Sequence, residues 1–162
     1  MSAPIDPAVR IQREDFDLAK ESAALCAGRS DIGALVTFSG LCRDEAGTLA
    51  ALELEHYPGM AEAEISRIAR QAAEGWPLNA LTVIHRYGKI RPGENIVLVL
   101  AASRHRQAAF DAAAFIMDFL KTRAPFWKKE YHSDGSEGGW VEARDIDDEA
   151  MQRWGEPSAA GR

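Results

Sequence analysis

Two amphipathic helices, each preceded by two strand-like segments, constrain the fold of this chain more than any other feature. Apolar residues from Ala61 to Trp76 recur at the spacing of one helical face, and Pro77 ends the pattern. A second helix is expected from about Gln107 to Arg123, where Pro125 stops it. A β-β-α order that occurs twice favours a two-layer α+β domain, in which helices pack on a largely antiparallel sheet.

The strand-like segments differ in the degree of burial that their residue patterns predict. Residues 49–57 alternate apolar with polar side chains, which indicates a strand with one exposed face. The unbroken apolar run from Ile96 to Ser103 is typical of a central strand covered on both faces. Residues 44–47 suit a hairpin loop, and residues 91–94 contain the Pro-Gly pair of a tight turn. The expected strands cover residues 33–42, 49–57, 81–90, 96–103, 126–131 and 140–143, after a loose start and a first helix over residues 15–27.

The chain has the size and composition of one globular domain. We expect a single domain over residues 1–150 and a flexible, acidic and polar tail over residues 151–162. The longest apolar stretch, Ile96 to Ala102, is far shorter than a membrane-spanning helix. The first residues show no secretory signal, and Cys26 and Cys42 are too few for a disulfide framework. The expectation is a cytoplasmic protein with no membrane partner.

Charge is unevenly distributed along the chain. The formal net charge is −6, and acidic residues are concentrated from Glu130 onward. Between Arg104 and Lys129, by contrast, Lys and Arg outnumber Asp and Glu. Such a basic region suits a small anion but not a nucleic acid duplex, so we expect no nucleic-acid partner. From charge alone, a solvated helix surface explains the region equally well.

Lys121 is the strongest candidate for a reactive side chain. On a helix it lies nearly in line with Phe110 and Met117, at the margin of the apolar face. There its stem can pack on the core while its amine reaches a cleft. Partial desolvation would favour the neutral amine, which can act as nucleophile or base. A lysine that only complements the negative end of the helix dipole is the alternative.

Other basic groups could converge with Lys121. The segment 103–106 joins the central strand to the long helix, a position suited to anion capture. Lys128 and Lys129 follow the turn after that helix, and Arg43 ends an expected strand. Arginine forms bidentate contacts with phosphate, whereas lysine can change its protonation state. Together these residues predict an anion pocket that contains a potentially reactive lysine.

Cys42 and the histidines give weaker signals. Arg43 could favour a thiolate at Cys42, but no histidine or aspartate partner is fixed to it, and a buried structural cysteine is favoured. Residues 134–139 are glycine-rich but precede no helix, which indicates a hairpin connection. No metal site and no cofactor are predicted, because metal-ligand spacing is absent among His56, His85, His105 and His132.

Several short segments, in order from about Gly33 to Arg144, match motifs of one known family. The run from Lys121 to Glu130 is the most specific of them. The matching segments are VTFSGLCR at 36–43, LEHYPGM at 54–60, VIHR at 83–86, Ser103 with His105 and Arg106, FIMD at 115–118, LKTRAPFWKKE at 120–130 and WVEAR at 140–144. In these segments the chain resembles the catalytic, large subunits of molybdopterin synthase.

The resemblance implies a sulfur transferase of molybdenum cofactor biosynthesis. Members of this family convert cyclic pyranopterin monophosphate into molybdopterin by installing the two dithiolene sulfurs. Sulfur arrives as a thiocarboxylate on the C-terminal Gly-Gly of a small ubiquitin-like subunit, whose tail enters a pocket of the large subunit. Two large subunits pair as a homodimer flanked by two small subunits, which makes a heterotetramer. The family fold is an α/β hammerhead, which is compatible with the α+β prediction.

The resemblance also implies roles for individual positions. Lys121 and Lys128 match active-site lysines, and Arg144 can serve its own site or that of a neighbouring subunit. Cys42 replaces a residue that is usually aliphatic, which argues against a role as sulfur carrier. A non-catalytic anion-binding or partner-docking domain is the competing interpretation. The substrate-binding positions implied by the match are Leu41, Cys42, Arg43, His105, Arg106, Lys129, Glu130 and Arg144.

Overall fold

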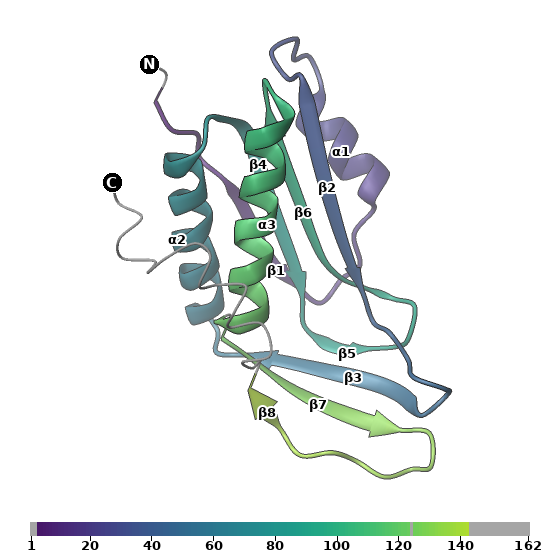
Figure 1. The fold of residues 1–162 in the computed structure, drawn as a ribbon. Coiled ribbons are helices and arrows are strands. Elements are labelled where there is room, and N and C mark those ends of the chain that lie inside the picture. The colour runs from purple at the N-terminus through teal and green to yellow at the C-terminus, as the bar shows by residue number, and fades with distance from the viewer. Residues whose placement is uncertain (1–2, 124, 143–162) are drawn as a thin grey trace.

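The computed structural model describes residues 3–123 and 125–142, and these residues form two four-stranded sheets and three helices (Figure 1). The first sheet contains, in spatial order, β1 (Ala8–Gln12), β4 (Leu78–Arg86), β6 (Asn95–Ser103) and β2 (Ala34–Leu41). The second contains β5 (Gly88–Ile90), β3 (Leu49–His56), β7 (Phe126–His132) and β8 (Val141–Glu142). The helices are α1 (Leu18–Cys26), α2 (Met60–Gly75) and α3 (Arg106–Thr122).

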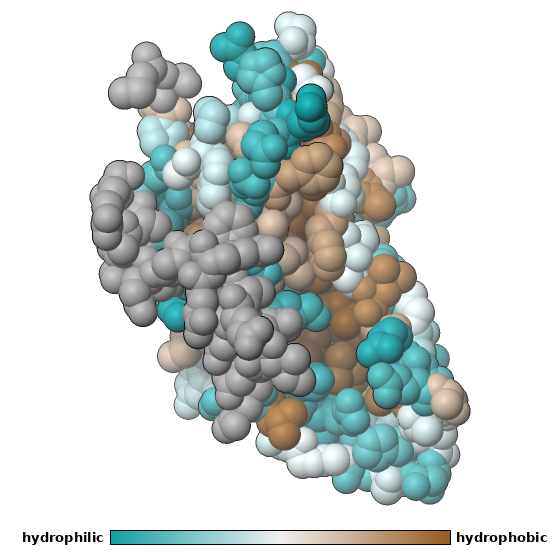
Figure 2. All heavy atoms as spheres, in the orientation of Figure 1, coloured by the Kyte–Doolittle hydropathy of each residue, from teal (hydrophilic) through white to brown (hydrophobic). Residues whose placement is uncertain are grey.

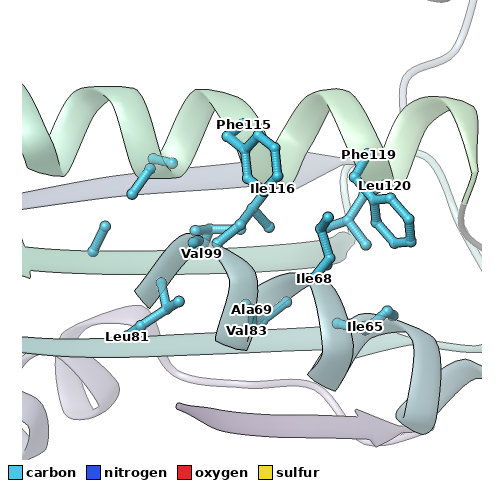
Figure 3. Close-up of a cluster of buried hydrophobic side chains, with 14 of the residues drawn as sticks. Ile65, Ile68, Ala69, Leu81, Val83, Val99, Phe115, Ile116, Phe119 and Leu120 are labelled. Carbon is cyan, nitrogen blue, oxygen red and sulfur yellow. The ribbon is translucent and has the colours of Figure 1, made fainter. Parts of the chain in front are cut away.

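The helices lie on both faces of the first sheet. Figure 1 shows α2 and α3 side by side on one face and α1 behind the other. On the first face, Ile65, Ile68 and Phe119 are almost completely buried and form the centre of the main core (Figure 3). On the second face, Phe16 packs with Leu98 in a smaller core. The two long helices expected from the sequence are confirmed to within one residue at each end.

Strand β6 lies at the centre of the first sheet, between β4 and β2. All its residues from Val97 to Ser103 are buried, which confirms the central strand expected from the unbroken apolar run. Its pairings with β4 and β2 are antiparallel, and only β1 is parallel to its neighbour β4. The α+β class with largely antiparallel strands is therefore confirmed.

The second sheet lies across the C-terminal end of α3 (Figure 1). Its inner face carries Leu52, Leu54 and Ile90, which pack with Cys42 in a third apolar cluster. Strands β7 and β8 pair as an antiparallel hairpin, so the glycine-rich residues 134–139 are confirmed as a hairpin connection. This second sheet brings β7 close to the end of β2, and the candidate site lies between them.

The hairpin expected between residues 33–42 and 49–57 is wrong. Both segments are strands, but β2 pairs with β6, whereas β3 pairs with β5 and β7 in the other sheet. Turn residues such as those at 44–47 indicate where the chain reverses, not which strand it then pairs with. The single sheet of the prediction is consequently two sheets.

Two further strand predictions need correction. The start of the chain is not loose, because residues 8–12 form the edge strand β1, in which Val9 and Ile11 alternate with polar neighbours. The expected strand 81–90 is divided into β4 and β5 at Gly88, which has a φ of 90°, a conformation that favours glycine. The tail predicted over residues 151–162 lies outside the described residues. No helix within the described ranges is long and apolar enough to cross a membrane.

Candidate active site

A cavity of about 460 Å³ lies where the C-terminal end of α3 meets the end of β2 and the second sheet. On the face drawn in Figure 2, a band of apolar surface lies beside α3 and is flanked by hydrophilic residues. The cavity itself combines apolar and charged side chains from five elements and one loop. It is lined by Leu41, Cys42, Arg43, Glu45, Thr48, Leu49, Leu52, Ile96, Lys121, Lys128, Glu130 and His132.

Lys121 lies in the last turn of α3 and lines this cavity. The adjacent Thr122 fixes the end of the helix, because its buried hydroxyl donates a hydrogen bond to the carbonyl oxygen of Asp118 at 2.7 Å. Lys121 itself is exposed, so the partial burial expected for its side chain is not found in the single chain.

A buried aromatic pair lies near Lys121. The ring of His85 stacks on that of Phe126, the first residue of β7, with centroids 4.0 Å apart. Burial lowers the pKa of His85 to about 4, and the positive charge of Lys121 contributes to this. His85 is therefore neutral at physiological pH and adds no positive charge beneath the cavity.

Alternation along β7 decides which of its charged side chains reach the cavity. Lys128, Glu130 and His132 line it, whereas the intervening Lys129 does not. The Nζ of Lys129 lies 3.2 Å from Oε2 of Glu137, and this hydrogen bond raises the pKa of Lys129. Lys129 is thus held by a carboxylate outside the cavity, contrary to the position expected for it. His132, for which no role was expected, takes a place in the cavity wall.

The end of β2 contributes Leu41, Cys42 and Arg43 to the opposite wall. The backbone of Cys42 is fixed on both sides: its N–H donates to the carbonyl oxygen of Glu94 at 2.8 Å, and its own carbonyl accepts from the N–H of Gly93 at 2.7 Å. Leu41, by contrast, leaves half of its surface exposed to the solvent. These backbone bonds hold the start of the loop that carries Arg43.

Cys42 and Arg43 differ sharply in exposure. Cys42 is 3% exposed, and burial, with added repulsion from Glu94 and Asp44, raises the pKa of its thiol. The thiol is therefore protonated at neutral pH, as befits a buried structural cysteine. Arg43 is exposed, and its guanidinium lies 3.0 Å from the carboxylate of Glu45. An exposed pair of this kind is weak enough for a bound anion to replace Glu45.

His105 and Arg106 lie at the end of α3 opposite to Lys121. His105 is the N-cap of the helix and Arg106 its first residue, and both are exposed. With a rise of about 1.5 Å per residue, the helix places Arg106 and Lys121 about 22 Å apart along its axis. The predicted convergence of these two groups therefore does not occur within one chain. Arg144, also predicted to bind substrate, lies outside the described residues.

The charges of the cavity suit an anion that has to be held beside an amine. Lys121 and Lys128 come from different elements, and within residues 3–123 and 125–142 neither has a carboxylate at ion-pair distance. Arg43 adds a guanidinium, which binds phosphate and carboxylate groups well. In the same ranges, no three His, Cys, Asp or Glu side chains gather as a metal site would require. The cavity can therefore hold an anionic ligand against one or two amines.

Comparison with known proteins gives a consistent result. A family model described as MoaE protein matches residues 11–123 of the chain. The molybdopterin synthase catalytic subunit of Mesorhizobium japonicum is 73% identical over 154 residues, which cover 95% of this chain and 97% of that protein. The matching protein of Rhizobium meliloti, of the same description, is 68% identical over 95% of this chain and 98% of its own length.

Solved structures show the same fold. The molybdopterin biosynthesis MoaE protein from Burkholderia ambifaria superposes with a TM-score of 0.81 at 49% identity, over 93% of this chain and 99% of its own. A complex of subunits 1 and 2 of the molybdopterin-converting factor from Helicobacter pylori contains a chain that superposes with a TM-score of 0.68 at 19% identity. That match covers 85% of this chain and 91% of the Helicobacter pylori chain, and at this identity it speaks for the fold alone.

Proposed function

The chain belongs to the MoaE protein family and acts as a sulfurtransferase of molybdenum cofactor biosynthesis, and we propose that the cavity between α3, β2 and β7 is its active site. The observation that carries the proposal is the meeting of Lys121 and Lys128 in one cavity, from two elements and, within the described residues, with no carboxylate at ion-pair distance from either amine. The proposed substrate is cyclic pyranopterin monophosphate, whose phosphate is held by Arg43 and the lysines. The proposed place of action is the cytoplasm.

The sulfur donor in this proposal is a small ubiquitin-like subunit that ends in a Gly-Gly thiocarboxylate. Two glycines have no side chains, so such a tail can enter a cavity of this size, and its negative charge suits Lys121 and Lys128. Each transfer forms one carbon–sulfur bond on the precursor, where a carbon–oxygen bond is broken, and the acyl carbon–sulfur bond of the tail is hydrolysed, which leaves the tail as a carboxylate. Two tails are therefore consumed for each dithiolene. One chain of the Helicobacter pylori complex of subunits 1 and 2 shares the fold of this chain, so a chain of this fold can pair with a different subunit.

Exposure of Lys121 in the single chain fits a site that is completed by its ligands. A lysine that attacks the thiocarboxylate carbon, or that accepts a proton, has to be neutral first. The precursor and the tail would exclude water from the cavity when both are bound, and this desolvation favours the neutral amine. Positioning of the two reactants then supplies much of the rate enhancement.

A second copy of the chain would complete the site. Because Arg106 and Lys121 lie at opposite ends of α3, one substrate can touch both only if they belong to different copies. In a symmetric homodimer each copy would contribute its Lys121 to one site and its His105 and Arg106 to the other. The proposed assembly is such a homodimer with one small subunit on each side, a heterotetramer.

Replacing Cys42 with serine is expected to leave substantial activity, because sulfur comes from the tail of the partner. The protonated, buried thiol cannot act as a nucleophile at neutral pH, and serine can keep a donor near the carbonyl oxygen of Ile90. Product formation per folded molecule measures the effect. Loss of turnover in a folded Cys42→Ser protein, together with a persulfide on Cys42 in the unsubstituted protein by mass spectrometry, would contradict this expectation.

Reconstitution tests the proposed function directly. The purified chain, a thiocarboxylated small subunit and the cyclic precursor are expected to yield the dithiolene product, with two small subunits consumed per product. Omission of the chain provides the control. If the chain binds both molecules but no sulfur is transferred, the competing interpretation, a non-catalytic docking domain, replaces this one.

A further inference from the structure

We propose that His132 is a positioning residue that holds the carboxylate of Glu130 away from Lys128, and that protonation of His132 makes the anion affinity of the cavity dependent on pH. The inference rests on the proposed function only in treating Lys128 as a cation that meets an anionic ligand. It concerns a side chain to which neither the family resemblance nor the comparisons assign a role.

The spacing along β7 would allow Glu130 to form an ion pair with Lys128, and the contact between Glu130 and His132 prevents this. Lys128 and Glu130 are two residues apart on the same face of the strand, so their backbones are separated by about 7 Å. Two long side chains of opposite charge can bridge that distance, and such a pair would neutralise the lysine. In the structure Glu130 turns the other way, and its Oε2 lies 3.3 Å from Nε2 of His132. Lys128 is left without a carboxylate at ion-pair distance within the described part of the chain.

A hydrogen-bond chain in the β7–β8 turn fixes the ring of His132. Asp134 Oδ1 accepts hydrogen bonds from the backbone N–H of Ser136 at 2.8 Å and from its hydroxyl at 2.6 Å. These two bonds lower the pKa of Asp134, so it is a carboxylate at neutral pH and only accepts. The hydroxyl proton of Ser136 is therefore committed to Asp134. The Ser136 oxygen, 3.1 Å from Nδ1 of His132, can only accept from that ring nitrogen.

Both nitrogens of His132 consequently face acceptors. Nδ1 faces the Ser136 oxygen and Nε2 faces the carboxylate of Glu130, so both contacts are hydrogen bonds only when both nitrogens carry a proton. The neutral ring has one N–H and loses one of the two bonds. Deprotonation also removes the positive charge that attracts the carboxylate, so it weakens the contact with Glu130 and frees that side chain to pair with Lys128.

Glu130 is the carboxylate that forms an ion pair with the ring of His132. No other carboxylate shares an ion pair with His132 in the described ranges. The side chains of His132 and Glu130 are 34% and 48% exposed, so water screens the pair and its effect is moderate. The charged side chains that line the same cavity as His132 are Glu130 and Lys128 of β7, Lys121 of α3, and Arg43 and Glu45 of the loop after β2, and the carboxylate of Asp134 lies in the adjoining turn.

Competitive acylation of lysine amines, read by mass spectrometry on the full chain, tests the proposal without any substrate. The acylation rate of Lys128 is divided by that of Lys20, an exposed lysine on α1. In acidic buffer, His132→Ala is expected to lower this ratio about two- to fivefold, because Glu130 then pairs with Lys128. In alkaline buffer the difference should shrink, since a neutral ring no longer attracts the carboxylate by charge.

Two further variants separate positioning from a structural role. His132→Gln keeps an amide donor for Glu130, so the acylation ratio of Lys128 to Lys20 is expected to stay above that of His132→Ala. Because glutamine does not titrate, the part of the pH dependence that comes from His132 should be lost. In a Glu130→Gln background, His132→Ala should have no effect, because no carboxylate remains to be released. Equal ratios in all proteins, or an effect of His132→Ala that persists without Glu130, would overturn the proposal.

Calorimetry of the binding of the cyclic precursor connects the acylation measurements with the proposed function. Affinities are expected to follow the same order as the acylation ratios, with a loss of about two- to fivefold for His132→Ala in acidic buffer. If the acylation ratios change as expected but no variant binds the precursor, the role of His132 stands and the proposed function fails. If the unsubstituted protein binds the precursor and His132→Ala changes neither measurement, the proposed function stands and the role of His132 is refuted.

Discussion

Replacing Lys121 with alanine is expected to reduce product formation by about a hundredfold to ten-thousandfold, the range typical of a lost acid–base group. The side chain is exposed on the last turn of α3, so the free energy of unfolding should change little. The measurement is the single-turnover rate of dithiolene formation with saturating precursor and thiocarboxylated small subunit. Lys20→Ala, which removes an exposed lysine from α1, is the matched control and should retain full activity.

Lys121→Arg distinguishes the chemistry of the amine from its charge. Arginine keeps a positive charge at the end of α3 but stays protonated near neutral pH, so it cannot attack or accept a proton. A loss of rate similar to that of Lys121→Ala is therefore expected, with precursor affinity better preserved. Full turnover by Lys121→Arg would assign Lys121 to electrostatic binding only. Full turnover by a folded Lys121→Ala protein would remove it from the mechanism.

The helices were predictable from the sequence, and strand pairing was not. Helix α2 is recognisable because its period of apolar residues and its terminating Pro77 are local signals. The pairing of β2 with β6 rather than β3 depends on contacts across more than fifty residues, about which the turn at 44–47 carries no information. The edge strand β1 left a signal, the alternation of Val9 and Ile11 with polar residues, but five residues are too few for a distinct pattern.

Parts of the candidate site were also within reach of sequence reasoning. The period of two along a strand separates Lys128 and His132 from Lys129, and the length of α3 alone excludes contact between Arg106 and Lys121 in one chain. The hydrogen-bond chain from Asp134 to Glu130 was not predictable, because it depends on how the turn after β7 folds back on the strand. Local periodicity therefore places side chains on faces, but only tertiary structure shows which faces share a cavity.

A mixed dimer of Lys121→Ala and Arg106→Ala chains is expected to recover about half of the activity of the unsubstituted dimer, although each variant alone is nearly inactive at low precursor concentration. If each site takes Lys121 from one copy and Arg106 from the other, the mixed dimer has one doubly defective site and one intact site. Arg106→Ala alone should weaken precursor binding about tenfold to a hundredfold, the loss of one charge-assisted hydrogen bond. Coexpression with two affinity tags and sequential purification isolates the mixed dimer for assay.

Recovery of this kind requires a site shared between the two copies, because neither chain in the mixed dimer has both residues intact. A site built within one chain would have either Lys121 or Arg106 missing in every copy, and the mixed dimer would stay as inactive as its parents. A dimer in which both copies carry Lys121→Ala, purified with the same two tags, controls for effects of the tags. The helix geometry makes the intersubunit outcome the expected one, since about 22 Å along α3 separate the two residues in a single copy. An inactive mixed dimer that still forms and still binds the small subunit would mean that Arg106 does not act on the substrate held by Lys121.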